Sequence, residues 1–492
     1  MSWAGRRWVD PSLVGLVSLV VYAAHGFDSD LGRDQGTFVY GGQQLAHGVP
    51  PYVGIFNSIG PVVDVVTGAG IRVGSALGLD DVRAARLTYL VVSVLTLVAL
   101  SVLAREALRS RAAGLVAPAV FLTFAGFLDL AADGPRDKTV MLLFLQLALL
   151  MLLRRRWWWA GVLTAAATLT WQPVLLTAVV AAVAAIVTSD RPRLRAAAAY
   201  LLGGAVPTVL VAALFAVSGH LRVAWWGFVV VNVGYTSQPN IFQSWSLLTG
   251  SYGWSLPLVV AGWVAMVVLG ARAVVRWRHS PTPLDRHLVV LGLGALVAGL
   301  WTSYAVNGGP DLFVVLPFAA LGITAALTEA TARLPLAAVR RVVAVVVVVA
   351  LAAAVAESVA TRDTTLRQER TGVAAMAGAL PAGATVLSID APSVPALLER
   401  RNPYPWQLFS SAMAPFLDDH LDGGLAGLAD RIRARRPALI AVGRHSVDDW
   451  LRPVLSRDYV RVGDGAHCTW YASTSLDAGV LQRLRDASSQ LT

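Results

Sequence analysis

Acidic side chains stand at two places where long apolar segments of this chain begin or end. Asp34 follows the first apolar segment, 11–27, and Asp137 with Lys138 immediately precedes another one. A charge in or beside a lipid bilayer costs free energy, so its position carries information. Taken singly, each acid could be a helix cap and Lys138 an interfacial anchor. Two such sites on one side of a membrane are more specific, and they favour a functional site there.

The segment around Asp34 is the richest polar stretch in the first half of the chain. We expect a short helix after Asp34 that carries Tyr40 and ends near 48–51, where Gly-Val-Pro-Pro follows. No His and carboxylate pair has the spacing of a metal site, so no tightly bound metal is expected, and a loosely held divalent cation stays open. The single Cys468 excludes an intramolecular disulfide and a cysteine-based metal site.

Composition indicates what must position these residues. Of the 492 residues 56% are hydrophobic and only 14% are charged, whereas soluble proteins carry about 25% charged residues. The apolar runs approach the ~20 residues that a helix needs to cross a bilayer. The net charge of +10 comes with arginine clusters between these runs, which is typical of membrane topology signals rather than of nucleic-acid binding. The chain is therefore a polytopic α-helical membrane protein.

The distribution of arginines predicts the topology. With the N-terminus inside as a retained signal anchor, and with segment 61–79 lying in the outer interface, most arginine clusters fall in cytoplasmic loops. Asp64 and the glycines of that segment also suit an interface better than lipid. This predicts an extracytoplasmic C-terminus and eleven spans, at 11–27, 87–104, 113–131, 139–153, 157–170, 174–189, 196–217, 255–271, 288–305, 311–330 and 342–360.

The composition changes near Thr361, where charges return and apolar runs shorten. Segments 384–390, 438–442 and 469–472 read as strands, and 368–380 and 421–435 read as helices. We therefore predict a membrane domain, 1–360, with outer loops 28–86 and 218–254, and a small extracytoplasmic α/β domain, 361–492. In that second domain, 404–406 (Tyr-Pro-Trp) could meet a substrate or simply pack.

Three short motifs carry a resemblance to a known family. Residues 34–40 (Asp-Gln-Gly-Thr-Phe-Val-Tyr), 45–52 (Leu-Ala-His-Gly-Val-Pro-Pro-Tyr) and the late loop 307–317 resemble loops of GT-C membrane glycosyltransferases. The similarity is to the branch of protein O-mannosyltransferases and lipid A aminoarabinose transferases. Two departures stand out. Gln35 occupies the place where the family often has a second acid, and 57–60 lacks the family's lysine, which removes one phosphate partner.

The resemblance implies an inverting transfer of a hexosyl or pentosyl group from a polyprenyl-phosphate sugar, at the outer face of a bacterial cytoplasmic membrane. Asp34 would be the catalytic base and Asp137 a second acidic site. The phosphate would be bound by positive charge, and the loops would contact substrate. The candidates for these two roles are Arg33, Arg136 and Lys138 for the phosphate, and Gln35, Tyr40, Tyr52, Asn307 and Asp311 for the substrate loops.

The acceptor hydroxyl could belong to a cell-wall glycan, a lipid or a protein, and the sugar is equally open. The main alternative is a transporter or flippase of a lipid-linked sugar, although such proteins usually show internal repeats and broken helices near the midplane. A non-catalytic scaffold is the third alternative. A glycosyltransferase requires Asp34 and Asp137 to meet near one cavity at the outer surface.

Overall fold

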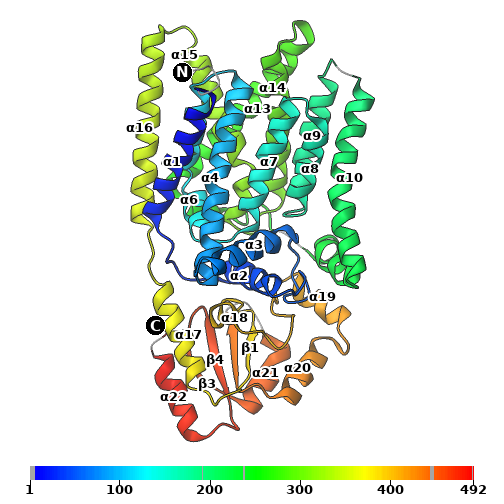
Figure 1. Ribbon diagram of the computed structural model, residues 1–492, viewed down its shortest axis with the longest axis vertical. Coiled ribbons are helices and arrows are strands. Elements are labelled where there is room, and N and C mark those ends of the chain that lie inside the picture. The colour runs from blue at the N-terminus through cyan, green and yellow to red at the C-terminus, as the bar shows by residue number, and fades with distance from the viewer. Residues whose placement is uncertain (1–5, 191, 237–238, 444–447, 490, 492) are drawn as a thin grey trace.

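The computed structural model describes the chain except for residues 1–5, 191, 237–238, 444–447, 490 and 492. A bundle of long helices forms one half of the molecule and a small α/β domain the other (Figure 1). Two helices, α2 (Arg33–Ala46) and α3 (Val62–Ala76), lie between these halves and run across the bundle axis. The loop that carries Asp34 is therefore in the middle of the molecule, where both halves can contact it.

The bundle is mainly helical from end to end. Its members are α1 (Arg6–His25), α4 (Asp81–Leu108), α5 (Ala113–Leu122), α6 (Ala125–Ala132), α7 (Asp137–Leu153), α8 (Trp157–Thr168), α9 (Val174–Val187), α10 (Arg193–Val217), α13 (Leu256–His279), α14 (Pro283–Tyr304), α15 (Leu316–Thr331) and α16 (Leu336–Ala360). Many of their buried side chains form one continuous apolar core, while α10 and α16 expose most of their apolar residues outward, as lipid-facing helices do.

The observed lengths of the helices, taken with their apolarity, give a stricter test of membrane crossing than the sequence pattern alone. Within the described residues, five helical stretches are long and apolar enough to cross a membrane, or six if the bent pair α5 and α6 forms one span. Shorter apolar helices occur at Val9–His25, Val174–Val187 and Leu316–Thr331. The protein is thus a multi-pass helical membrane protein with a small C-terminal sheet, and the count of eleven spans stays a prediction.

The predicted span at 113–131 is not one straight helix. The chain breaks between α5 and α6 with a bend of 73°, because Phe124 leaves the helical conformation with φ −80° and ψ 89°. The freed backbone N–H of Ala125 donates to Ser255 Oγ at 3.1 Å. Ser255 comes from a distant part of the chain, so a hydrophobicity pattern cannot reveal this break.

The predicted outer loop 218–254 is largely helical in the structure. It contains α11 (Leu221–Trp225), a π-helical segment (Trp226–Tyr235), α12 (Trp245–Tyr252) and a short 3-10 turn (Gly253–Ser255). Residues 237–238 of this loop lie outside the described residues. The late loop after α14 also folds into a 3-10 helix, Gly309–Val314, which contains the predicted site residue Asp311.

The C-terminal domain is a four-stranded sheet in the order β1-β2-β4-β3. Strands β1 (Val386–Ile389) and β2 (Leu439–Gly443) pair in parallel, and β2–β4 and β4–β3 pair antiparallel. The three predicted strands are present. β3 (Tyr459–Gly465) was not predicted, because Arg461 interrupts its apolar residues and the strand ends in Gly-Asp-Gly, so it forms no apolar run. Strand β4 is Cys468–Ser473. The helices of the domain are α17 (Leu366–Gly378), α18 (Ser393–Leu398), α19 (Met413–His420), α20 (Gly424–Arg435), α21 (Asp448–Asp458) and α22 (Ala478–Ser488).

The C-terminal domain docks directly on α2. Gly36 permits the contact, since a Cβ there would lie 2.5 Å from the backbone N of Ser393 in α18. Farther along α2, the Tyr40 hydroxyl accepts from the backbone N–H of Asn402 at 2.9 Å, and Gln43 Nε2 donates to the Ala396 carbonyl at 3.0 Å. One face of α2 is thereby fixed to the domain.

Candidate functional site

The Asp34 carboxylate is open to its surroundings. Asp34 is the second residue of α2, and its side chain is 61% exposed. The residue at the helix N-cap is Gly32, and no side chain caps the helix, so the alternative reading of Asp34 as a cap is wrong. Its oxygens lie 3.9 Å from Arg33 Nη1 and 3.7 Å from Arg136 Nη1. Asp34 is therefore a charged, accessible carboxylate with cations on two sides.

A second charged cluster begins at the N-terminus of α7. Lys138 Nζ lies 3.6 Å from an Asp137 oxygen and 3.1 Å from Asp311 Oδ1. Asp311 in turn accepts the backbone N–H groups of Asn307 at 2.6 Å and Gly308 at 3.0 Å. These bonds hold the late loop against α7. The two acids surround Lys138 and keep its ammonium group charged in a nearly closed position.

Arg136 joins the two clusters. It precedes Asp137 in the chain, its Nε donates to the Leu130 carbonyl at 2.9 Å, and its Nη1 approaches Asp34. The charge of Asp34 also acts on Asp137 and Lys138. The structure thus brings residues from three distant segments to one place, as an active site at this surface requires. Their chemical roles remain predictions.

Arg33 has a second partner that the sequence did not reveal. Its Nε and Nη2 donate to Asp390 Oδ1 at 2.9 and 2.6 Å, and the Asp390 side chain is fully buried. Asp390 follows β1 with a left-handed φ of 54°, and its backbone N–H donates to the Gln407 carbonyl at 2.6 Å. Arg33 is therefore paired with the C-terminal domain and also lies beside Asp34, and its binding of a phosphate stays a prediction.

Two predicted substrate contacts are occupied within the protein. The Tyr40 hydroxyl is bonded to Asn402, and the Tyr52 hydroxyl donates to the Ile59 carbonyl at 2.7 Å. Both rings are almost completely buried, and so is Gln35. Tyr52 also has a left-handed φ of 69°, which fixes the turn after α2. These contacts make the two tyrosines part of the frame of the loop, and their contact with a substrate stays a prediction.

An apolar cavity lies beside the turn that contains Tyr52. It has a volume of about 190 Å³ and is lined by Tyr52, Pro61, Leu169, Phe215, Trp225 and Phe228, among other apolar residues. Gln172 and Asn232 donate to the Ser58 carbonyl at 3.2 and 2.7 Å and hold the loop at its edge. This is the loop in which the expected lysine is absent, so its backbone position is set by neutral amides.

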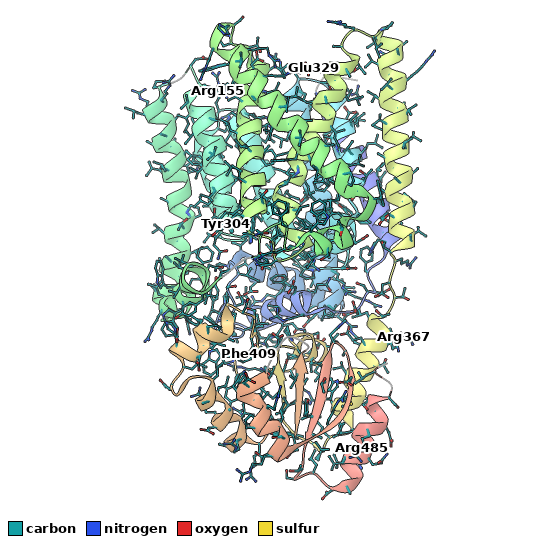
Figure 2. All side chains as sticks on the ribbon, turned by 180° about the vertical axis from the view of Figure 1, so that it is seen from behind. Arg155, Tyr304, Glu329, Arg367, Phe409 and Arg485 are labelled. Carbon is teal, nitrogen blue, oxygen red and sulfur yellow. The ribbon has the colours of Figure 1, made fainter. Side chains whose placement is uncertain are left out.

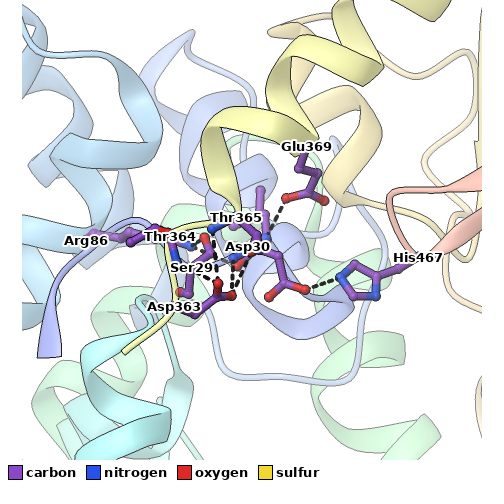
Figure 3. A network of polar contacts seen from close by, with 9 residues as sticks. Ser29, Asp30, Arg86, Asp363, Thr364, Thr365, Glu369 and His467 are labelled. Atoms are coloured by element: carbon purple, nitrogen blue, oxygen red, sulfur yellow. Dashed lines mark hydrogen bonds and ion pairs between the residues drawn. The ribbon is translucent and has the colours of Figure 1, made fainter. Parts of the chain in front are cut away.

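A network of polar contacts fixes the loop between α1 and Asp34 (Figure 3). Arg86 donates to the carbonyls of Phe27, Ser29 and Asp30 at 2.6 to 2.9 Å. Glu369 Oε2 accepts the Leu31 N–H at 2.7 Å, and burial raises the pKa of Glu369 to about 7. The network joins α4, the loop and α17, and it positions Asp34 without touching it.

The side chain of Asp30 closes the same network on the domain side. His467 Nε2 lies 2.5 Å from Asp30 Oδ2, and the Asp30 N–H points to Asp363 Oδ2 at 3.4 Å. Figure 3 shows Asp30 between Glu369 and His467. Within the described ranges, no group of three or more His, Cys, Asp and Glu side chains has the arrangement of a metal site.

The sequence matches no protein-family model and no curated protein. Solved structures do match. ArnT from Cupriavidus metallidurans, in a crystal structure bound to undecaprenyl phosphate, is 14% identical over 96% of this chain and 99% of its own, with a TM-score of 0.64. The apo form of the same protein is 16% identical over 99% of both chains, with a TM-score of 0.65. This chain has the GT-C fold.

Two larger proteins extend the GT-C likeness. The arabinofuranosyltransferase AftD from Mycobacteria is 16% identical over 97% of this chain but only 40% of its own length, with a TM-score of 0.52. The Archaeoglobus fulgidus oligosaccharyltransferase is 12% identical over 94% of this chain and 73% of its own, with a TM-score of 0.51. The TM-scores show a shared fold, and the substrates must be argued from the site.

Proposed function

We propose that this protein is an inverting glycosyltransferase that moves a sugar from a polyprenyl phosphate to an acceptor hydroxyl. The observation that carries the proposal is the open Asp34 carboxylate beside Arg136, within the charged cluster at the end of the helical bundle. Structural neighbours with the same fold include ArnT bound to undecaprenyl phosphate and an arabinofuranosyltransferase. A glycosyltransferase of this fold needs such a base and such cations together.

The proposed reaction assigns one task to each group. The acceptor oxygen attacks the anomeric carbon while the bond from that carbon to the phosphate oxygen breaks, and the lipid phosphate leaves with the electron pair. Asp34 takes the acceptor proton, since a hydroxyl is a weak nucleophile unless a base lies within hydrogen-bond reach. Arg136 and Lys138 stabilise the charge that develops on the leaving phosphate. Asp137 and Asp311 orient Lys138 for this task.

The proposed location is the outer face of a bacterial cytoplasmic membrane, with the N-terminus cytoplasmic and the C-terminal domain extracytoplasmic. Arg155, from a predicted cytoplasmic cluster, and Arg485, from the C-terminal domain, lie at opposite ends of the molecule (Figure 2). That arrangement agrees with the arginine distribution. The apolar cavity beside Tyr52 suits the first part of a prenyl chain.

A transporter of a lipid-linked sugar would require polar groups along a path through the bundle. The charged residues described above instead gather at one end of the bundle, where they contact the α/β domain. We therefore favour transfer over transport. The acceptor is a cell-wall glycan, a lipid or a protein, and the donor sugar is a hexose or a pentose.

The decisive experiment measures transfer from a panel of radiolabelled polyprenyl-phosphate sugars in membranes that contain wild type, Asp34→Asn or Asp28→Asn. Loss of a general base costs roughly 10²–10⁴-fold in rate. The transfer rate of Asp34→Asn should therefore fall by that factor, while its expression stays unchanged. Asp28→Asn is the matched control, because Asp28 is also an exposed acid of the same loop. Equal rates for wild type and Asp34→Asn would place the base elsewhere.

A further inference from the structure

The C-terminal domain contains a cavity that the proposed reaction does not use. Its volume is about 440 Å³, and it lies among β1, α18, the segment after α18 and the turn after α2. Pockets that bind small molecules typically measure about 300–1,000 Å³. Unlike the apolar cavity near the bundle, this one is lined by charged and polar side chains, namely Arg400, Arg401, Arg435, Asn402, Ser388 and Thr385.

Three arginines share this cavity without a nearby counter-charge. Within the described part of the chain, none of Arg400, Arg401 and Arg435 has a carboxylate within 4.0 Å. The neighbouring acid Glu399 is not among the residues that line the cavity. Three like charges in one concave site repel one another, and an oxyanion bound among them would relieve that repulsion.

The wall of the cavity is held in a fixed shape. The Asn402 side chain accepts the Ser388 N–H at 2.8 Å and donates to the Tyr404 carbonyl at 2.9 Å, and the Asn402 backbone N–H donates to the Tyr40 hydroxyl. Pro403 and Pro405 restrict the backbone on either side of Tyr404. The Arg435 guanidinium lies 5.6 Å from the centre of the Tyr404 ring, which limits where it can point. Such preorganisation lowers the cost of binding a ligand.

We propose that this cavity binds a sugar residue that carries a carboxylate or a phosphate, as part of the acceptor. The oxyanion would contact the arginines in the bidentate manner that guanidinium groups favour. The acceptor assignment rests on the proposed function. Tyr40, which is bonded to Asn402 of the cavity wall, is six residues from Asp34 on α2, about 9 Å along the helix axis. An acceptor of a few sugar units would span that distance.

The test is a direct binding measurement on the full-length protein in detergent. Isothermal titration with glucuronic acid and with glucose 6-phosphate should show saturable binding, and glucose should bind at least tenfold more weakly. Arg401→Gln/Arg435→Gln should weaken binding of the charged sugars at least tenfold. The matched control, Arg457→Gln/Arg485→Gln, removes the same charge from exposed positions of α21 and α22 and should bind as wild type does.

The outcomes separate this inference from the proposed reaction. Asp34→Asn should bind the charged sugars as well as wild type, since Asp34 does not line the cavity. A protein that transfers sugar but binds neither charged sugar would overturn the inference and leave the reaction intact. Equal binding by the cavity variant and the control variant would also overturn it. A third result would overturn it as well. If dioctanoyl phosphatidylglycerol bound and neither charged sugar did, the arginines would be assigned to a lipid headgroup.

Discussion

Arg33 stands between two carboxylates that are held in opposite ways. Asp390, on the domain side, is fully buried, and two guanidinium nitrogens donate to one of its oxygens. Asp34, on the bundle side, is 61% exposed and lies 3.9 Å from the same guanidinium. The first arrangement holds Asp390 in charged hydrogen bonds inside the protein, and the second leaves Asp34 open to accept a proton from another molecule.

The contrast separates residues that build the site from residues that react in it. The buried pair fixes the domain to α2, together with the contacts of Tyr40 and Gln43. Because the start of α2 is fixed on one face, Asp34 can remain exposed without becoming mobile. We therefore expect substitutions on the two sides of Arg33 to affect different measurements: stability on the domain side and transfer rate on the bundle side.

The largest effect on stability should come from Lys138→Met. The substitution removes the only cation that the described structure pairs with Asp311, and it leaves Asp137 and Asp311 nearly buried without a compensating charge. Breaking a buried pair in this way costs about 3–5 kcal/mol. The melting temperature in detergent should fall sharply and transfer should be lost. Arg72→Met, at an exposed position of α3, is the control, and similar melting curves for both variants would contradict this account.

A smaller effect should follow from Asp390→Asn. The change removes the charge that neutralises Arg33 but keeps the shape of the side chain, at a cost of about 2 kcal/mol for a charged hydrogen bond. The C-terminal domain should become more sensitive to protease while transfer falls less than in Asp34→Asn. Asp390→Asn should thus change mainly protease sensitivity, and Asp34→Asn mainly the transfer rate. The comparison fails if Asp34→Asn is the variant whose C-terminal domain becomes more sensitive to protease.

The sequence revealed the acids but only part of their surroundings. Asp34, Asp137 and Lys138 could be found because charged residues stand out at the ends of apolar segments. Asp311 was found through the resemblance of its loop, and the structure adds its bond to Lys138. These predictions rested on local signals, namely an apolar run, a charge beside it and a short motif.

What the sequence could not reveal depends on distant partners. Arg33 and Asp390 are 357 positions apart, and an aspartate at the end of a predicted strand gives no sign of its partner. The break after Phe124 depends on Ser255. Glu369 falls in the predicted helix 368–380, and only its place beside the loop of Asp30 and Leu31 shows that it is buried.

Glu369 gives the smallest and most specific prediction. Burial raises its pKa to about 7 from an ordinary value near 4.5, so between these values the folded protein keeps a proton that the unfolded chain releases. Stability should therefore fall as the pH rises from about 4.5 to about 7. In Glu369→Gln this fall should shrink, by on the order of 1 kcal/mol, because an amide can still accept the Leu31 N–H and does not titrate.

The measurement is the melting temperature of wild type, Glu369→Gln and the control Glu329→Gln at pH 5, 6, 7 and 8. Glu329 is exposed, and it lies at the end of the molecule away from the C-terminal domain (Figure 2), so its variant should follow the wild-type profile. If the melting temperature of Glu369→Gln changed with pH as that of wild type does, the Glu369 carboxylate would be ionised in the folded protein throughout this range. The domain would then be held to the loop of Asp34 by charge, as it is at Arg33, and not by a protonated acid.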